Sequence, residues 1–262
     1  MAHAAEFPGP FSLRGDGTIR LRAQGGGALH VTFRRGEVYD PAGLERINRL
    51  FGAPWQAETE RVSLRLIELL DHLQDHFREA AFTLRSGYRS PTTNAALRAR
   101  GRLAAQSSLH MEGEAVDGHF DGVSAADVFA YVKGLACCGI GYYHGREVHL
   151  DTGPPRYWDE TTSGTESREP QGNAKIMVAT DRDRYRSGER ATLRFMRITD
   201  YPIRVPTTWT MEWQPLDADP SARWERQEVT PTFVATSDTC AALRDRREAK
   251  SATLGMARPP RA

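Results

Sequence analysis

Two histidines and one aspartate lie in two short segments and together offer the side chains that a metal ion needs. His110 and Asp117 belong to the segment 107–117, and His149 belongs to the segment 147–153. Imidazole and carboxylate groups are typical ligands of Zn²⁺, and three protein ligands leave the fourth tetrahedral position for a water that the metal can activate at neutral pH. We therefore interpret these residues as a catalytic-type site for one zinc ion per chain.

The third candidate ligand is flanked by carboxylates at the spacing of a β-strand. Glu147, His149 and Asp151 alternate along the chain. Residues two apart on a strand share a face at a separation of about 6.6 Å. One of the two carboxylates can therefore sit near the metal and act as a general base, and we rank Asp151 first and Glu147 second. Asp151 as a fourth ligand would instead close the site and make it structural.

The elements that must position these residues follow from hydrophobic periodicity and turn signals. Helices are predicted at residues 41–51, 61–78, 92–100 and 124–136, and short strands at 82–84, 115–117, 139–143 and 147–150. The second helix has an apolar face typical of a core helix, made by Leu66, Leu69, Leu70, Leu73 and Phe77. Helices before strands, without regular βαβ alternation, indicate an α+β fold with a small antiparallel sheet and flanking helices.

Changes in composition divide the chain into five parts. We predict an N-terminal extension or β segment at residues 1–27, a domain with the candidate zinc site at 28–158, a linker at 159–173, a β-rich module at 174–236 and a flexible tail at 237–262. The linker is polar and almost free of apolar residues, whereas the module contains several strand-like runs. We expect the module to be sandwich-like.

Composition and charge limit the kinds of partner. Of the 262 residues, 39% are hydrophobic and 26% are charged, which is ordinary for a globular protein. The formal net charge of +1 gives no electrostatic reason to expect binding to nucleic acid or to an anionic membrane. No apolar run approaches the ~20 residues of a membrane-spanning helix, so no membrane span is expected. The sequence leaves the oligomeric state open.

The cysteines and the first residues bear on the cellular compartment. Cys137 and Cys138 are adjacent in an apolar run and are expected to be buried as small hydrophobic residues; a disulfide from one of them to Cys240 is the alternative. The first residues lack the basic and apolar regions of a signal peptide, although Ala2-His3-Ala4 fits a small-x-small cleavage site. A signal peptide that has been removed is therefore compatible with the sequence.

Several motifs follow one another at spacings that match a known family. They are Ser86-Gly87-Tyr88-Arg89-Ser90, Ser108-Leu109-His110, Ala115-Val116-Asp117, Gly139-Ile140-Gly141-Tyr142-Tyr143, Val148-His149-Leu150-Asp151-Thr152-Gly153 and Arg156-Tyr157-Trp158. Over roughly residues 28–158 the chain closely resembles the MepK-like murein endopeptidases, part of the wider group of zinc D-Ala-D-Ala peptidases, lysostaphin-type enzymes and hedgehog domains. The resemblance implies a zinc domain of this type, His110, Asp117 and His149 as zinc ligands, and cleavage of peptide cross-links in peptidoglycan.

The same resemblance suggests roles for residues around the ligands. Arg89 falls where related enzymes contact the substrate or its developing oxyanion, and a structural arginine paired inside the turn is the other interpretation. Ser108 falls where related enzymes hold a substrate carboxylate, and Tyr88 is a second candidate substrate contact. His119 is expected to face the site as support for the metal or as a catalytic group.

One departure from the wider group concerns the general base. Many relatives carry Glu-x-x-His or His-x-His at the third ligand, whereas this chain has His149-x-Asp151, as MepK-like proteins do. The base therefore stays open between Asp151 and Glu147.

Three functional hypotheses follow. The leading one is a periplasmic or otherwise extracytoplasmic zinc peptidase that hydrolyses peptide bonds in peptidoglycan, as an endopeptidase or a carboxypeptidase. The second is a zinc-stabilised module that binds peptidoglycan or a protein without turnover. The third assigns docking to the C-terminal module, so that deletion of residues 170–262 abolishes localisation and retains hydrolysis.

Overall fold

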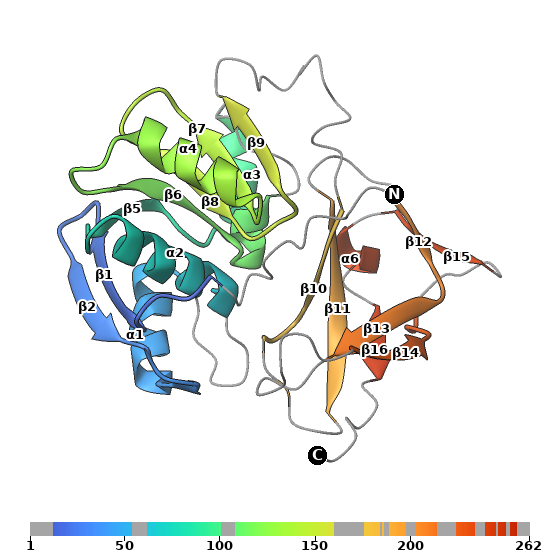
Figure 1. Cartoon of the computed structure of the whole chain (residues 1–262). Helices are drawn as coiled ribbons and strands as arrows, with labels where there is room; N and C mark the ends of the chain where they lie inside the picture. The colour runs from blue at the N-terminus through green and yellow to red at the C-terminus, as the bar shows by residue number, and fades with distance from the viewer. Residues whose placement is uncertain are drawn as a thin grey trace.

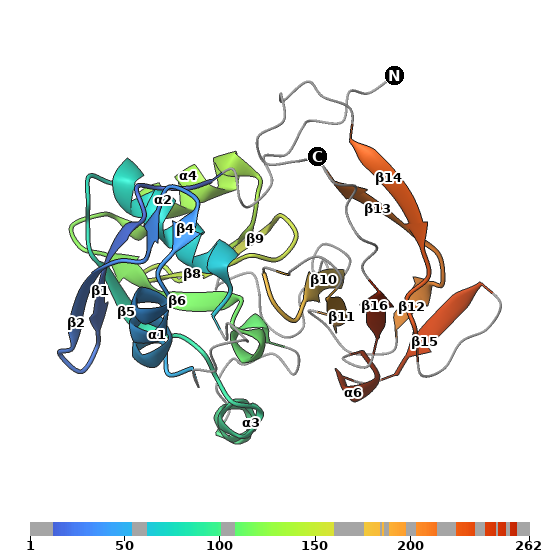
Figure 2. The same cartoon turned by 90° about the horizontal axis from the view of Figure 1, so that it is seen from below.

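The structure of the chain, a computed structural model, has two parts that lie side by side (Figures 1 and 2). It describes residues 13–53, 62–100, 108–159, 176–183, 185, 189–197, 203–213, 224–233, 239–244, 246–249 and 252–255. The first part is a seven-stranded sheet with helices, and the second holds smaller sheets. The fold is therefore mixed α and β. The predicted linker at 159–173 lies outside the described residues apart from its first residue.

Seven strands form the main sheet in the order β2-β1-β5-β6-β8-β7-β9. They are β1 (Thr18–Ala23), β2 (Ala28–Thr32), β5 (Phe82–Ser86), β6 (Ala115–Phe120), β7 (Gly139–Tyr142), β8 (Val148–Asp151) and β9 (Arg156–Asp159). The predicted antiparallel sheet is wrong in two places, because β1 pairs with β5, and β7 with β9, in parallel. Parallel pairing needs a crossover connection, and two helices provide one between β1 and β5.

These two helices are α1 (Pro41–Leu50) and α2 (Leu64–His76), and they are followed by α3 (Pro91–Ala99), the short 3-10 helix η2 (Leu109–Glu112) and α4 (Ala125–Leu135). The four predicted helices are confirmed. Each starts after a side chain that accepts a hydrogen bond from a backbone N–H of the first turn, namely Asp40, Ser63, Ser90 and Ser124. Between β2 and α1, β3 (Arg34–Arg35) and β4 (Val38–Tyr39) form a short antiparallel pair.

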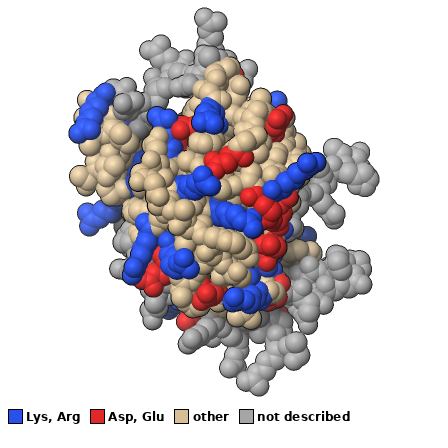
Figure 3. Space-filling view, turned by 90° about the vertical axis from the view of Figure 1, so that its left-hand side faces the viewer, with Lys and Arg blue, Asp and Glu red and all other residues tan. Residues whose placement is uncertain are grey.

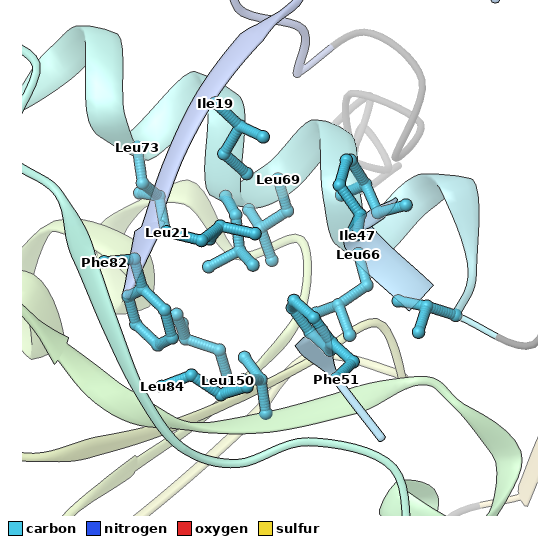
Figure 4. Packing of buried hydrophobic residues seen from close by; sticks show 14 of the residues in the cluster. Ile19, Leu21, Ile47, Phe51, Leu66, Leu69, Leu73, Phe82, Leu84 and Leu150 are labelled. Carbon is cyan, nitrogen blue, oxygen red and sulfur yellow. The ribbon is translucent and has the colours of Figure 1, made fainter. Parts of the chain in front are cut away.

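One face of the main sheet is apolar and packs against α1, α2 and α4. Leucines of α2 belong to one buried cluster with Ile19 of β1, Phe82 of β5 and Leu150 of β8 (Figure 4). Because side chains alternate along a strand, the neighbours of these core residues point to the opposite face. Asp117 and His149 are among those neighbours, so the apolar core fixes the direction in which the candidate ligands point.

The outer side of the first part carries charges of both signs. Figure 3 shows basic and acidic side chains interspersed over this side. On β1, Arg20 pairs with Glu79 and Arg22 pairs with Asp121. This mixture produces no extended field of a single sign on the face that Figure 3 shows.

The second part is β-rich, as predicted. β10 (Ile176–Thr180), β11 (Arg190–Arg197) and β16 (Thr253–Gly255) form one sheet, β12 (Ile203–Pro206) pairs with β15 (Cys240–Leu243), and β13 (Trp209–Trp213) pairs with β14 (Glu225–Val229). The segment 237–262 differs from the predicted flexible tail, because β15, α6 (Arg246–Ala249) and β16 lie within it. Its short apolar runs bury Leu243 and Leu254 in the core of this part. The sandwich arrangement stays a prediction.

The bonding of two cysteines differs from both expectations drawn from the sequence. Cys137 and Cys138 form a disulfide with each other, so neither is a buried thiol and neither is bonded to Cys240. The two lie in the turn between α4 and β7, where adjacent side chains can meet. Within the described residues, no helix combines the length and the apolar character that crossing a membrane requires.

Candidate metal centre

The register of the sheet places two of the candidate ligands side by side. Asp117 of β6 pairs with Ser86 of β5 on one side and with His149 of β8 on the other. His149 pairs in turn with Gly141 of β7, and Gly141 pairs with Trp158 of β9. Paired residues on adjacent strands present their side chains on the same face. The strands thus form one row of residues across the polar face of the sheet.

His110 completes the cluster from outside the sheet. It belongs to η2, which ends shortly before β6 begins. Its Nε2 lies 3.2 Å from Oδ2 of Asp117, and Oδ1 of the same carboxylate lies 2.9 Å from Nδ1 of His149. One ligand atom from each residue lies within 4.8 Å of the others, and all three side chains are buried. The structure therefore brings the three predicted ligands together.

In each imidazole, one nitrogen is bound to a group outside the three-residue cluster and the other nitrogen faces the cluster. The partner of the first nitrogen, here called the outer nitrogen, shows where the proton of the ring lies. Nδ1 of His110 lies 2.8 Å from the carbonyl oxygen of Gly87, and because a carbonyl only accepts, Nδ1 carries the proton. Nε2 of His149 lies 2.9 Å from Oδ2 of Asp151, and by the same argument it donates to that carboxylate. This assignment, made from the hydrogen-bond network, leaves the lone pairs of His110 Nε2 and His149 Nδ1 facing Asp117.

This donor set fits a metal ion. The oxygens of Asp117 also only accept, so lone pairs from three side chains converge on one buried point where a cation would satisfy them. Each imidazole is held from behind, one by a carbonyl and one by a carboxylate, as is usual for histidines that bind metals. Two histidines and one carboxylate also form a ligand set that zinc uses in catalytic sites.

Burial and pairing shift two of the three ligands, His110 and Asp117, toward the charge states that metal binding needs. Burial lowers the pKa of His110, because desolvation disfavours the imidazolium. Burial alone would raise the pKa of Asp117, but the contacts with His110 and His149 outweigh it and hold that pKa well below its usual range. Burial alone would lower the pKa of His149, but its hydrogen bonds with Asp117 and Asp151 outweigh burial and raise that pKa. A neutral imidazole and an ionised carboxylate are the forms in which these groups bind metals.

Asp151 lies directly behind His149 and is fully buried. Its Oδ1 accepts hydrogen bonds from Nη1 of Arg156 at 2.7 Å and from the backbone N–H of Gly153 at 2.8 Å. Burial would raise its pKa, but Arg156 and His149 outweigh that effect and lower the pKa below its usual range. Gly139 leaves room for the ion pair, because a Cβ there would lie 2.3 Å from Oδ2 of Asp151. These contacts favour an orienting role and argue against the predicted role of general base.

Comparisons with known proteins match the region of the chain that holds these residues. A family model described as peptidoglycan L,D-endopeptidase MepK matches residues 18–158. The chain belongs to this family. MepK of Escherichia coli K12 is 33% identical over 135 residues, which are 51% of this chain and 74% of that protein. A probable peptidoglycan L,D-endopeptidase MepK of Haemophilus influenzae is 30% identical over 136 residues, which are 51% of this chain and 73% of that protein. No solved structure gives a significant match.

The region that matches the MepK family contains the main sheet except the last residue of β9, and it contains the three candidate ligands; it ends before the second part of the structure. It also contains three residues around the site to which the sequence gave no role. Arg156 binds Asp151, the hydroxyl of Tyr143 lies 3.4 Å from Oδ1 of Asp117, and the ring of Trp158 lies 4.9 Å from that of His149. All three stand in motifs that the MepK resemblance rests on, which is the signal that pointed to them.

Arg89 lies in the centre, as the resemblance implied. Its Nη2 donates to Oδ2 of Asp117 at 2.6 Å, and its Nε donates to Oγ of Ser86 at 2.8 Å. Tyr88 is half-buried and packs against the apolar core, and Ser108 is half-buried just before η2. Substrate contacts of Tyr88 and Ser108 stay predictions.

His119 lies two residues after Asp117, and Glu147 lies two residues before His149. The register that pairs Gly118 with Val148 sets His119 of β6 beside Glu147. Nδ1 of His119 is buried and has no hydrogen-bond partner among the described residues, and its Nε2 lies 3.6 Å from a carboxylate oxygen of Asp121. Glu147 is occupied differently, because its Oε2 accepts a hydrogen bond from the Arg85 guanidinium at 2.7 Å.

A second group of three titratable residues, here called the acidic cluster, consists of Asp16, Asp71 and Asp75. Oδ2 of Asp71 accepts the backbone N–H of Gly17 at 2.9 Å, and Oδ2 of Asp75 accepts that of Asp16 at 2.8 Å. Nη2 of Arg34 lies 3.6 Å from Oδ2 of Asp71. These contacts attach the turn before β1 to helix α2.

Proposed function

We propose that this chain is a zinc peptidase that hydrolyses peptide bonds in peptidoglycan, as an L,D-endopeptidase. The observation that carries the proposal is the convergence of His110 Nε2, His149 Nδ1 and the Asp117 carboxylate on one buried point. This point lies in the region that matches the MepK family, and the relatives in that family carry the L,D-endopeptidase name.

Each residue of the proposed centre has a separate task. His110, Asp117 and His149 would hold the ion, with one zinc per chain. When bound, zinc supplies a Lewis acid that polarises a scissile carbonyl and makes water a stronger nucleophile near neutral pH. Gly87 and Asp151 fix the orientation of the two imidazole rings through their outer nitrogens.

Arg89 is proposed to serve both a ligand and the substrate. Its bonds to Asp117 and Ser86 fix the plane of the guanidinium. Its Nη1 makes no hydrogen bond to a described residue, so it can receive the negative charge that develops on the carbonyl oxygen of the scissile bond. The paired structural role and the oxyanion role are therefore compatible.

Proton transfer is proposed for His119 instead of Asp151. An imidazole can both accept and donate a proton, and Nδ1 of His119 has no hydrogen-bond partner among the described residues, whereas the oxygens of Asp151 are bound to Arg156, Gly153 and His149. His119 shares the face of Asp117 two residues further along β6, about 7 Å away by strand geometry. We expect His119→Gln to lower kcat about a hundredfold and to leave zinc affinity unchanged. An unchanged kcat would indicate that a carboxylate, and not His119, transfers the proton.

The proposed compartment is the periplasm or another extracytoplasmic space, where peptidoglycan lies. The disulfide between Cys137 and Cys138 supports this location, because disulfides persist in oxidising compartments. The proposed partner is the peptide part of peptidoglycan.

The decisive experiment is a digest of purified peptidoglycan with zinc-loaded protein, with the products identified by mass spectrometry. His110→Ala tests the centre, and His30→Ala is the matched control because His30 is exposed on β2. We expect cross-linked dimers to disappear with the unaltered chain and with His30→Ala, and to persist with His110→Ala. Loss of only a terminal residue from monomers would indicate a carboxypeptidase. Tight zinc binding without any product would indicate a binding module.

A further inference from the structure

The second part of the structure contacts the segment that carries the first metal ligand. Met177 and Ala179 of β10 and Met196 of β11 form a buried cluster with Leu109 and Ala115. Leu109 directly precedes His110 in η2, and Ala115 opens the strand that carries Asp117. In Figures 1 and 2, β10 and β11 lie on the side of the second part that faces the first. The apolar contact therefore flanks both ends of the loop between the two ligands.

Arg194 of β11 reaches into the same loop. Its two terminal nitrogens lie 3.8 Å from a carboxylate oxygen of Glu112 and 3.7 Å from one of Glu114. Both glutamates are buried, and Glu114 is fully so. Burying a carboxylate is costly without a cation beside it, so Arg194 stabilises the conformation in which these two side chains point inward. Glu112 and Glu114 stand between the ligands His110 and Asp117.

Asp183 fastens the other side of the loop. Its Oδ2 accepts the backbone N–H of Leu64 at 2.7 Å, and its Oδ1 lies 3.5 Å from Nε of Arg65. Arg65 also lies 3.7 Å from Glu114, so it links the glutamate to the second part of the structure. Ser63, next in the chain, donates its backbone N–H to the carbonyl of Gly113 at 2.9 Å. The start of α2, the ligand loop and the segment after β10 are thus joined in one network.

We propose that the C-terminal β part is a brace for the metal centre, and that Arg194 is a positioning residue for the loop between His110 and Asp117. The inference rests on the proposed zinc function and adds a contribution from residues beyond 18–158, the region that matches the MepK family. It differs from the docking hypothesis, because a brace links the module to metal affinity and a docking domain does not. Among the described residues Arg194 contacts Glu112, Glu114 and Thr180 and none of the three proposed zinc ligands, so its effect passes through the two glutamates.

The test measures zinc affinity in the whole 262-residue chain by competition with a fluorescent chelator. Arg194→Ala removes the cation, and Arg190→Ala is the matched control because Arg190 is exposed on the same strand. We expect zinc to bind about tenfold more weakly to Arg194→Ala and with unaltered affinity to Arg190→Ala, in line with the effect of residues that support ligands indirectly. The absorption spectrum of bound Co²⁺ should change in Arg194→Ala only.

Each outcome decides a separate point. If folded Arg194→Ala has the zinc affinity and the Co²⁺ spectrum of the unaltered chain, the brace is refuted, even if its free energy of unfolding is lower. If Arg194→Ala does not fold, Arg194→Gln takes its place, because a glutamine removes the charge and keeps part of the packing of the long side chain. Unaltered zinc affinity in that variant also refutes the brace. If the unaltered chain binds no zinc, the proposed function fails and the brace fails with it.

Discussion

The metal centre and the acidic cluster each bring three titratable side chains within 4.8 Å, yet they have opposite electrostatics. In the metal centre, two imidazoles hold the pKa of Asp117 well below its usual range despite burial. In the acidic cluster, burial first and then the neighbouring carboxylates Asp75 and Glu68 raise the pKa of Asp71 to about 7, against the Gly17 hydrogen bond that lowers it. Proximity of carboxylates alone therefore does not define a metal site.

The partners of each cluster explain the difference. In the metal centre, the hydrogen bonds to Gly87 and Asp151 hold the outer nitrogens of the rings and leave the inner lone pairs facing one point. In the acidic cluster, the carboxylates accept backbone N–H groups of Asp16 and Gly17, so their lone pairs serve the fold. The first arrangement prepares a site for a cation, and the second anchors a turn.

The largest expected effect is on zinc binding, and it should differ between substitutions in the two clusters. We expect His149→Ala to weaken zinc binding by more than about a hundredfold, because it removes a ligand, whereas Asp75→Ala should leave both affinity and stoichiometry unchanged. Equilibrium dialysis with metal analysis measures both quantities. A fall in stoichiometry with Asp75→Ala would show that the acidic cluster also takes zinc and would remove the contrast.

The next effect concerns the group behind His149. Asp151→Asn removes the charge that pairs with buried Arg156, so we expect zinc affinity to fall about tenfold to a hundredfold. The free energy of unfolding should also fall, by about 3 kcal/mol, because the Arg156 guanidinium stays buried without its partner. Chelator competition and urea unfolding measure the two effects. An Asp151→Asn protein with normal affinity and no activity would identify Asp151 as the base after all.

The acidic cluster should show itself in the pH dependence of stability. Asp71 has a pKa of about 7 in the folded chain and an ordinary value of 3.8, so the folded state keeps its proton while the unfolded state loses it between these values. Its contribution to the free energy of unfolding therefore falls as pH rises from about 4 to 7 and is constant above that. In Asp71→Asn this fall should be smaller by on the order of 2 kcal/mol, measured by urea unfolding at pH 5 and pH 8. Equal slopes in both proteins would contradict the raised pKa.

The grouping of His110, Asp117 and His149 could be predicted from the sequence, and the contacts that support them could not. The three residue types and their motifs suggested a common site, and the structure brings the three side chains together. Asp151 was found, but its task depends on Arg156, which β9 brings close by pairing in parallel with β7. The hydrophobic periodicity of a strand does not show which other strand it pairs with or in which direction. The contact between Asp151 and Arg156 was therefore not predictable from the sequence.

The fold could also be predicted from the sequence only in part. The helix at 64–76 was predictable because its apolar residues repeat along one face. The acidic cluster was missed because Asp16 stands in a turn and Asp71 on a helix far along the chain, and only tertiary packing joins them. The strands β15 and β16 were missed because they stand in a segment rich in Ala and Arg, a composition that is not typical of strands.

The smallest expected effect lies at the edge of the metal centre and asks whether Glu147 belongs to it. Glu147 shares the face of the ligands, but its carboxylate already forms an ion pair with the Arg85 guanidinium. In this it is similar to the carboxylates of the acidic cluster, which also have partners within the fold. An exposed ion pair of this kind contributes about 0–1 kcal/mol. We therefore expect Glu147→Gln to change kcat/KM less than about twofold and to leave zinc affinity unaltered, because its removal disturbs a surface pair and no proton transfer. Steady-state cleavage of a purified cross-linked muropeptide measures this, with Arg85→Gln as the matched control. If Glu147→Gln loses activity about a hundredfold while Arg85→Gln does not, Glu147 is the general base, and its pairing with Arg85 describes only the chain without substrate.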